Sequence, residues 1–107
     1  MSAFYKKKTP EGMLTKSIRD LLRTLGIFHW KQYQTLGSPL GIADILGIYQ
    51  GKMLAIECKA PRGKLSPHQE RFLEIIREQG GIGILAYSVE DVIKGLKIQD
   101  RFLNFRR

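Results

Sequence analysis

Two carboxylates and a lysine lie near the ends of apolar segments in the middle of the chain: Asp44, Glu57 and Lys59. Residues 53–59 read Met-Leu-Ala-Ile-Glu-Cys-Lys, a pattern that predicts a buried strand ending in two opposite charges. Side chains alternate between the two faces of a strand, so Glu57 and Lys59 share one face. Charges in such a position need an ion pair, hydrogen bonds or a metal. A simple Glu57/Lys59 ion pair is one interpretation, and a metal site is the other.

A tight turn at Gln50-Gly51 joins this strand to a second predicted strand at residues 42–49, which makes an antiparallel hairpin. Counted back from the turn, Asp44 falls opposite Glu57. Directly opposed residues have their Cβ atoms about 5 Å apart, and two carboxylates at that distance repel each other unless a cation lies between them. A hard divalent cation such as Mg²⁺ takes oxygen ligands and keeps several waters, which suits two carboxylates and a phosphate.

Lys59 lies on the same face as Glu57 and can reach about 6 Å toward the same point. Its ammonium could there orient an attacking water or neutralise phosphate charge. The hairpin therefore predicts one site that holds a metal, a nucleophile and a cation.

The elements that must position this hairpin follow from caps and periodicity. Thr9, Pro10 and Glu11 predict a helix start, and an apolar stripe continues to Leu25 before Gly26 ends the helix. The remaining predicted elements are a strand at 27–34, a loop at 36–41, a helix from a Ser66–Gln69 capping box to about Gly80, a strand at 82–87 and a helix from Ser88 through Leu96.

The predicted order is helix, three strands, helix, strand, helix. The passage from strand 53–59 through a helix to strand 82–87 predicts a parallel crossover, whereas the hairpin is antiparallel. We therefore expect an α/β fold with a small mixed sheet flanked by helices.

Composition limits the function classes. The chain has 107 residues, of which 43% are hydrophobic, which predicts one globular domain at 9–107 behind a flexible basic arm at 1–8. The single cysteine, Cys58, excludes an internal disulfide and predicts a reduced, buried thiol. No apolar run is long enough to span a bilayer, so we expect a soluble intracellular protein, in the cytoplasm of a bacterial or virus-infected cell. A net charge of +8 favours a nucleic-acid partner.

These residues resemble a known family. Asp44 followed by Glu57-x-Lys59 at the end of an apolar strand resembles the PD-(D/E)XK nuclease superfamily, and the resemblance covers about residues 9–87. The narrower likeness is to its virus-type replication-repair nuclease (VRR-NUC) domain, through Pro10-Glu11, Gly41-Ile42-Ala43-Asp44, Glu57-Cys58-Lys59 and the run Pro61-Arg62-Gly63-Lys64-Leu65-Ser66-Pro67-His68-Gln69. The proline that often precedes the family's aspartate is Ala43 here, a position that carries no ligand.

The resemblance implies a restriction-endonuclease-like core and a role for each matching residue. Asp44, Glu57 and the backbone carbonyl of Cys58 would bind Mg²⁺ or Mn²⁺, and Lys59 would be catalytic. Glu11 would hold the metal directly or through water, and Gln69 would lie near the site.

Several of these residues could instead have a purely structural or surface role. Glu11 could serve only as a favourable first-turn carboxylate, and Gln69 could only complete a capping box. His29 and His68 are expected at the surface, with His68 the better placed to touch phosphate. Arg62 and Lys64 flank Gly63 just past the strand end, where they could hold a DNA backbone, whereas the other basic residues could be solvated surface. Those others are Lys6 to Lys8, Arg101, Arg106 and Arg107.

The function expected from the resemblance is a metal-dependent DNA endonuclease of replication, repair or recombination. No base-reading motif is evident, so recognition by backbone and shape is expected, as in branched, flap or four-way-junction DNA. Stand-alone domains of the family resemble junction-cleaving enzymes, and cutting two strands needs two sites, which predicts a homodimer. The rival is a non-catalytic nucleic-acid-binding module with the same fold.

Overall fold

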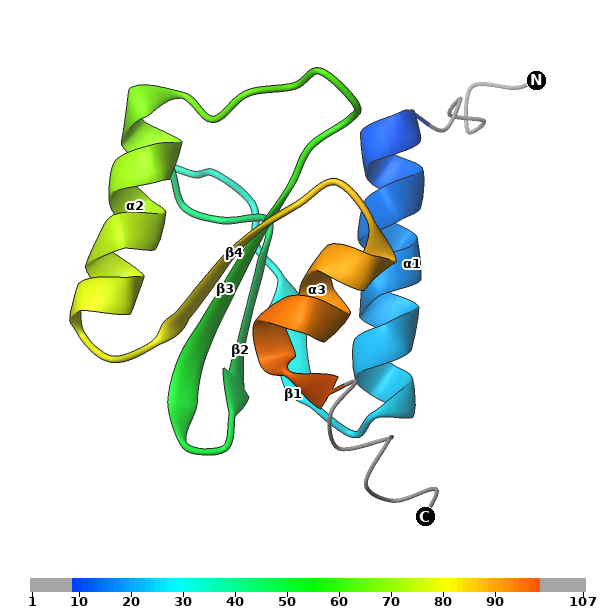
Figure 1. Ribbon diagram of the computed structural model, residues 1–107. Helices are drawn as coiled ribbons and strands as arrows, with labels where there is room; N and C mark the ends of the chain where they lie inside the picture. Colours follow the sequence, from blue (N-terminus) through cyan, green and yellow to red (C-terminus); the bar gives the residue numbers. More distant parts are fainter. Residues whose placement is uncertain (1–8, 99–107) are drawn as a thin grey trace, which may run out of the picture.

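The structure, a computed structural model, describes residues 9–98 (Figure 1). The basic arm expected at 1–8 lies outside the described residues, as do Arg101, Arg106 and Arg107. The elements are α1 (Pro10–Thr24), β1 (Phe28–Lys31), β2 (Ile45–Tyr49), β3 (Lys52–Cys58), α2 (Pro67–Glu78), β4 (Ile82–Ala86) and α3 (Val89–Leu96). Their order and types are those predicted from the sequence.

The four strands form one mixed sheet in the order β1-β2-β3-β4. The first three strands pair antiparallel, and β3 pairs with β4 in parallel through α2. In Figure 1, α2 lies on one side of the sheet, and α1 and α3 lie on the other. The predicted mixed sheet flanked by helices is confirmed.

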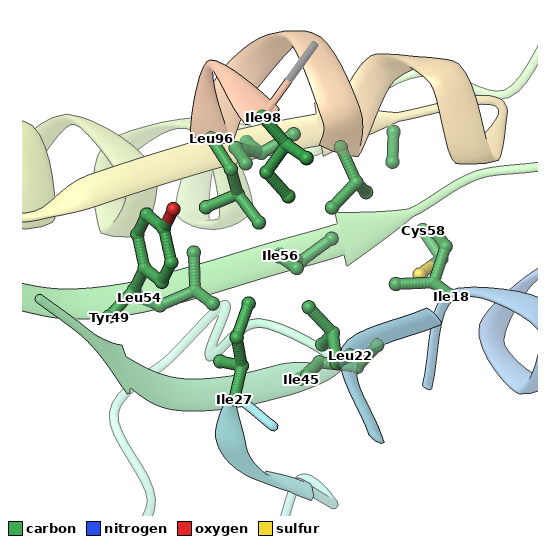
Figure 2. Packing of buried hydrophobic residues seen from close by; sticks show 13 residues of the cluster. Ile18, Leu22, Ile27, Ile45, Tyr49, Leu54, Ile56, Cys58, Leu96 and Ile98 are labelled. Atoms are coloured by element: carbon green, nitrogen blue, oxygen red, sulfur yellow. The ribbon is translucent and has the colours of Figure 1, made fainter. Parts of the chain in front are cut away.

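Side chains of β3 point alternately to the two faces of the sheet, so they pack into two separate cores. Leu54, Ile56 and Cys58 face α1 and α3 and pack with Ile18 and Leu22, as Figure 2 shows. The opposite face of the sheet packs beneath α2 in a smaller core formed by Ala43, Leu46, Ala55 and Leu73. Glu57 projects from this second face, as the period of two predicts.

The helix starts follow the predicted caps. The Thr9 hydroxyl accepts the backbone N–H of Gly12 at 2.9 Å, and Pro10 begins α1. At α2, the Ser66 hydroxyl accepts the N–H of Gln69, and the Gln69 side chain accepts the N–H of Ser66, which completes the capping box. Each cap satisfies N–H groups that the first turn leaves without partners.

Two predicted strands are longer than the observed ones. The strand expected at 27–34 ends at Lys31, and the strand expected at 42–49 begins at Ile45. The loop expected at 36–41 is therefore longer: the thirteen residues from Gln32 to Asp44 form one connection held by local bonds such as Ser38 N–H to Thr35 O at 3.0 Å. Aromatic and apolar residues at the two ends of this connection favoured longer strands, but the pairing of β1 with β2 stops at Lys31↔Ile45.

None of the helices between residues 9 and 98 is long and apolar enough to cross a bilayer.

Candidate active site

Asp44 and Glu57 lie opposite each other, as the hairpin count predicted. The Gln50-Gly51 turn has positive φ at both residues, 51° and 79°, and the ladder beyond it runs to the pair Ile45↔Ile56. Asp44 is the next residue outward, just before β2 rather than inside it as expected. Its carbonyl accepts the N–H of Gln32 at 2.7 Å, which ties the residue to the chain leaving β1.

The two carboxylates are held by crossed hydrogen bonds to backbone. Glu57 Oε1 accepts the backbone N–H of Asp44 at 3.2 Å, and Asp44 Oδ2 accepts the backbone N–H of Cys58 at 2.8 Å. Each side chain is therefore fixed by the strand that carries the other. Asp44 Oδ1 accepts no hydrogen bond from any residue between 9 and 98, and the ammonium of Lys31 lies 3.9 Å from it as an ion-pair partner.

Glu57 is a buried carboxyl, only 2% exposed. Burial, and after it the negative charge of Asp44, raise the pKa of Glu57 to about 7, while the ammonium of Lys59 acts in the opposite direction. The charge of Glu11 adds a smaller upward contribution to this pKa, which places the helix carboxylate in the same electrostatic environment. A pKa near neutrality is typical of a group kept ready to bind a cation or a proton.

Lys59 follows the last residue of β3 and keeps the β-ladder geometry, since its N–H donates to Ala86 O at 3.0 Å. Its ammonium Nζ lies 3.7 Å from Glu57 Oε2. The Glu57/Lys59 ion pair therefore exists together with the opposed Asp44, and the metal site stays a prediction.

Gln69 both completes the capping box and lies beside Glu57. Its side-chain oxygen completes the capping box of α2, and its Nε2 donates to Glu57 Oε2 at 3.0 Å. One side chain thus links the start of α2 to the buried carboxylate.

Glu11 and Asp44 line the same open pocket, whose volume is about 580 Å³. Glu11 lies in the first turn of α1, and Ala60 closes another part of the pocket beyond β3. The pocket also contains Lys31, which the sequence analysis did not single out. One feature could have identified Lys31. It ends β1 and pairs with Ile45, the residue directly after Asp44, so it lies next to Asp44.

Cys58 donates its backbone N–H to Asp44, and its side chain packs in the larger core. The side chain is fully buried, and burial raises the pKa of its thiol to about 12. Figure 2 shows the thiol beside Ile18 in the larger core. This agrees with the expected reduced, buried thiol, while a metal-binding role for the Cys58 carbonyl stays a prediction.

The basic loop after β3 is a defined turn. Gly63 N–H donates to Ala60 O at 2.9 Å, and the Tyr87 hydroxyl donates to Gly63 O at 2.7 Å. Arg62 occupies the third turn position with φ 72°, a conformation that glycine normally adopts. Arg62 and Lys64 are exposed beside Lys59, and their contact with DNA stays a prediction.

His68 is exposed in the first turn of α2, as expected. His29, expected at the surface, is only partly exposed: its ring Nδ1 lies 2.9 Å from Ile27 O, and Nε2 is buried without a hydrogen-bond partner among the described residues. Along β1, the partly exposed His29 alternates with the exposed Phe28 and Trp30, which lie on the opposite face.

The donor set fits a hard divalent cation that is only partly coordinated by protein. Across residues 9–98, no group of three or more His, Cys, Asp or Glu side chains is arranged to hold an ion. Mg²⁺ is commonly held by one or two carboxylates, with water and substrate phosphate completing its shell. Asp44 and Glu57 match that pattern, and Glu11 lines the same pocket as Asp44, so a direct or water-mediated contact from Glu11 stays a prediction.

Comparisons with known proteins found a matching family model and a similar protein. Residues 4–90 match the family model of the VRR-NUC domain. A Holliday junction resolvase RecU from Mycoplasmopsis pulmonis (strain UAB CTIP) is 29% identical over 110 residues, an alignment that covers 97% of this chain and 59% of that protein. The chain therefore spans about three fifths of the length of this relative.

Proposed function

The chain belongs to the VRR-NUC domain family, and from that membership we propose that it is a Mg²⁺- or Mn²⁺-dependent DNA endonuclease that hydrolyses phosphodiester bonds. The observation that carries the proposal is the opposition of Asp44 and Glu57, with Lys59 Nζ 3.7 Å from Glu57 Oε2. Two fixed carboxylates and a lysine at one strand end form the arrangement that metal-assisted hydrolysis needs.

Each residue has a distinct part in the proposed reaction. Asp44 and Glu57, with the Cys58 carbonyl, would hold the metal, which supplies a Lewis acid and an activated water when bound. Lys59 would orient that water or stabilise charge on the phosphate. Glu11 would hold the metal from α1 through water, and Gln69 would keep Glu57 Oε2 in place.

The DNA would lie against the basic side of the strand end. Arg62, Lys64 and His68 are exposed on the loop and helix start that follow Lys59. The net charge of +8 would attract the phosphate backbone before specific contacts form. Contacts of this kind position DNA without reading its sequence.

The proposed substrate is branched DNA, above all a four-way junction, in replication, repair or recombination. Support comes from the relative described as a Holliday junction resolvase, of which this chain spans 59%. The side chains that the site offers are suited to phosphate and metal, so selectivity would come from DNA shape.

Cleavage of two strands would require a second copy of the chain. β1 is an edge strand, and large apolar side chains stay exposed on the face it shares with β2 and β3. These residues, the edge patch, are Phe28 at 67%, Ile48 at 50%, Met53 at 38% and Trp30 at 37% exposed. Phe28, Ile48 and Met53 form one row across the sheet. An isologous contact between two edge patches would bury this row in a C2 dimer.

The experiment compares labelled duplex, flap and four-way-junction DNA with Mg²⁺, Mn²⁺ or EDTA. The nuclease proposal predicts metal-dependent products, greatest for the junction. The rival, a non-catalytic nucleic-acid-binding module, predicts binding that survives EDTA and no products with either metal. Light scattering on the same protein tests the dimer, which Phe28→Lys should dissociate.

A further inference from the structure

Lys31 places a second ammonium at the carboxylate pair. It is the last residue of β1, and its Nζ lies 3.9 Å from Asp44 Oδ1. Its side chain is 24% exposed and lines the open pocket together with Glu11 and Asp44. The pair is therefore bracketed by lysines, with Lys59 beside Glu57 and Lys31 beside Asp44.

The ammonium of Lys31 forms an ion pair with Asp44 but no hydrogen bond to it. A separation of 3.9 Å exceeds hydrogen-bonding distance. Lys31 Nζ instead donates to Gln32 O at 3.1 Å and lies 4.4 Å from the centre of the Tyr33 ring. Because an ammonium has three donors, it retains the capacity to bind an anion that enters the pocket.

An ammonium at the position of Lys31 can offset the repulsion between the site's carboxylates and a DNA phosphate. A phosphodiester carries a negative charge, and on this side of the site it would meet the carboxylates of Asp44 and Glu11. A cation 3.9 Å from Asp44 Oδ1, on a side chain that lines the same pocket, reduces that repulsion at short range, where salt screens it least. The ammonium of Lys59, in contrast, lies beside Glu57, 3.7 Å from its Oε2.

We propose that Lys31 is a substrate-positioning residue that binds a DNA phosphate on the Asp44 side of the site. This inference rests on the proposed nuclease function, since it assigns the residue to the same DNA-binding site. The ammonium also contacts the Gln32 carbonyl and the Tyr33 ring, and it lies 3.9 Å from Asp44 Oδ1, beyond hydrogen-bonding distance.

The competing explanation is that Lys31 only neutralises Asp44. The two explanations differ in the salt dependence of DNA binding. Loss of a phosphate contact lowers the slope of log affinity against log salt by about 1, whereas loss of an internal counter-ion leaves that slope unchanged.

The test measures four-way-junction binding in EDTA across a salt series for wild type, Lys31→Gln, Lys31→Arg and Lys52→Gln. Lys52 is the matched control, because it is an exposed lysine at the opposite end of β3, about 20 Å from the site. We expect Lys31→Gln to weaken binding about three- to tenfold with a slope smaller by about 1. Lys31→Arg should bind as wild type, and Lys52→Gln should keep the wild-type slope.

An unchanged slope in Lys31→Gln, with thermal unfolding showing a folded protein, overturns the inference. Tyr33→Ala and Tyr33→Phe give a second check, because only the alanine variant removes the ring that holds the ammonium. Equal affinity for these two variants would also count against it. Failure of the nuclease proposal gives a different result: wild type would bind the junction but yield no products with Mg²⁺ or Mn²⁺.

Discussion

Asp44 and Glu57 fix each other through the backbone of the opposing strand. The N–H of Asp44 donates to Glu57 Oε1 at 3.2 Å, and the residue after Glu57 donates its N–H to Asp44 Oδ2 at 2.8 Å. The crossed bonds hold two carboxylates side by side in the folded protein before any ligand arrives. Preorganisation of this kind is what a metal or phosphate site requires.

The first prediction concerns pH and the buried carboxyl. In the metal-free protein the pKa of Glu57 is raised from 4.5 to about 7, so the folded state holds the proton more tightly than the unfolded state. The resulting stability is fully present below about pH 4.5 and is lost as pH rises through 7. Glu57→Gln stays neutral, so relative to wild type it should gain stability across this window, by about 3 kcal/mol at most.

Chemical denaturation of both proteins in EDTA at a series of pH values measures the effect. The difference in free energy of unfolding should grow between pH 4.5 and 7 and then level off. A difference that does not vary with pH would contradict the burial argument for Glu57.

The second prediction separates the two roles of Gln69. Gln69→Ala removes the donor to Glu57 and half of the capping box, whereas Ser66→Ala removes only the hydroxyl that caps α2. Both variants should lose about 1 kcal/mol of stability. Only Gln69→Ala should also lower the cleavage rate, by about 10- to 100-fold, because Glu57, the proposed metal ligand, loses the hydrogen bond from Gln69.

Thermal unfolding and single-turnover cleavage of junction DNA measure these effects. Equal cleavage by the two variants at matched folded fractions would assign Gln69 to the cap alone.

The third prediction uses the unusual backbone of Arg62. With φ at 72°, Arg62 occupies a conformation that costs a non-glycine residue about 1 kcal/mol. Arg62→Gly should therefore raise stability slightly and yet weaken DNA binding, with a salt slope lower by about 0.9. A variant that is more stable and binds with an unchanged slope would remove Arg62 from the DNA-contacting set.

The fourth prediction concerns the contact between Gly41 and the start of α2. A Cβ at Gly41 would lie 2.2 Å from the His68 carbonyl carbon, and φ there is 73°. Gly41→Ala should cost about 2 kcal/mol or more and displace the helix start that carries Gln69. Gly37→Ala is the matched control, because φ is 91° but nothing lies within 4 Å of the new methyl group. Similar melting temperatures for the two variants would refute the close approach.

Much of this site was predictable because it depends on local rules. The turn at Gln50-Gly51 sets the hairpin register, and that register alone places Asp44 opposite Glu57. The capping box at Ser66 and Gln69 is likewise written in residues three apart.

Other features depend on packing between distant segments. The strand limits at Lys31 and Ile45 follow from where β1 stops pairing with β2, so alternation alone overestimated both strands. The ammonium of Lys31 beside Asp44 depends on the path of the connection between β1 and β2. The contact between Gln69 Nε2 and Glu57 requires α2 to dock on β3, which no local pattern reveals.

The most direct test of the account is junction cleavage by Asp44→Asn. Asparagine keeps an oxygen to accept the Cys58 N–H, so the fold and the crossed bonds should persist while a charged metal ligand is lost. Single-turnover cleavage of a four-way junction in Mg²⁺ should fall at least about a hundredfold, with the melting temperature nearly unchanged. Cleavage at the wild-type rate by this variant would contradict the assignment of Asp44 and Glu57 as the metal-binding pair.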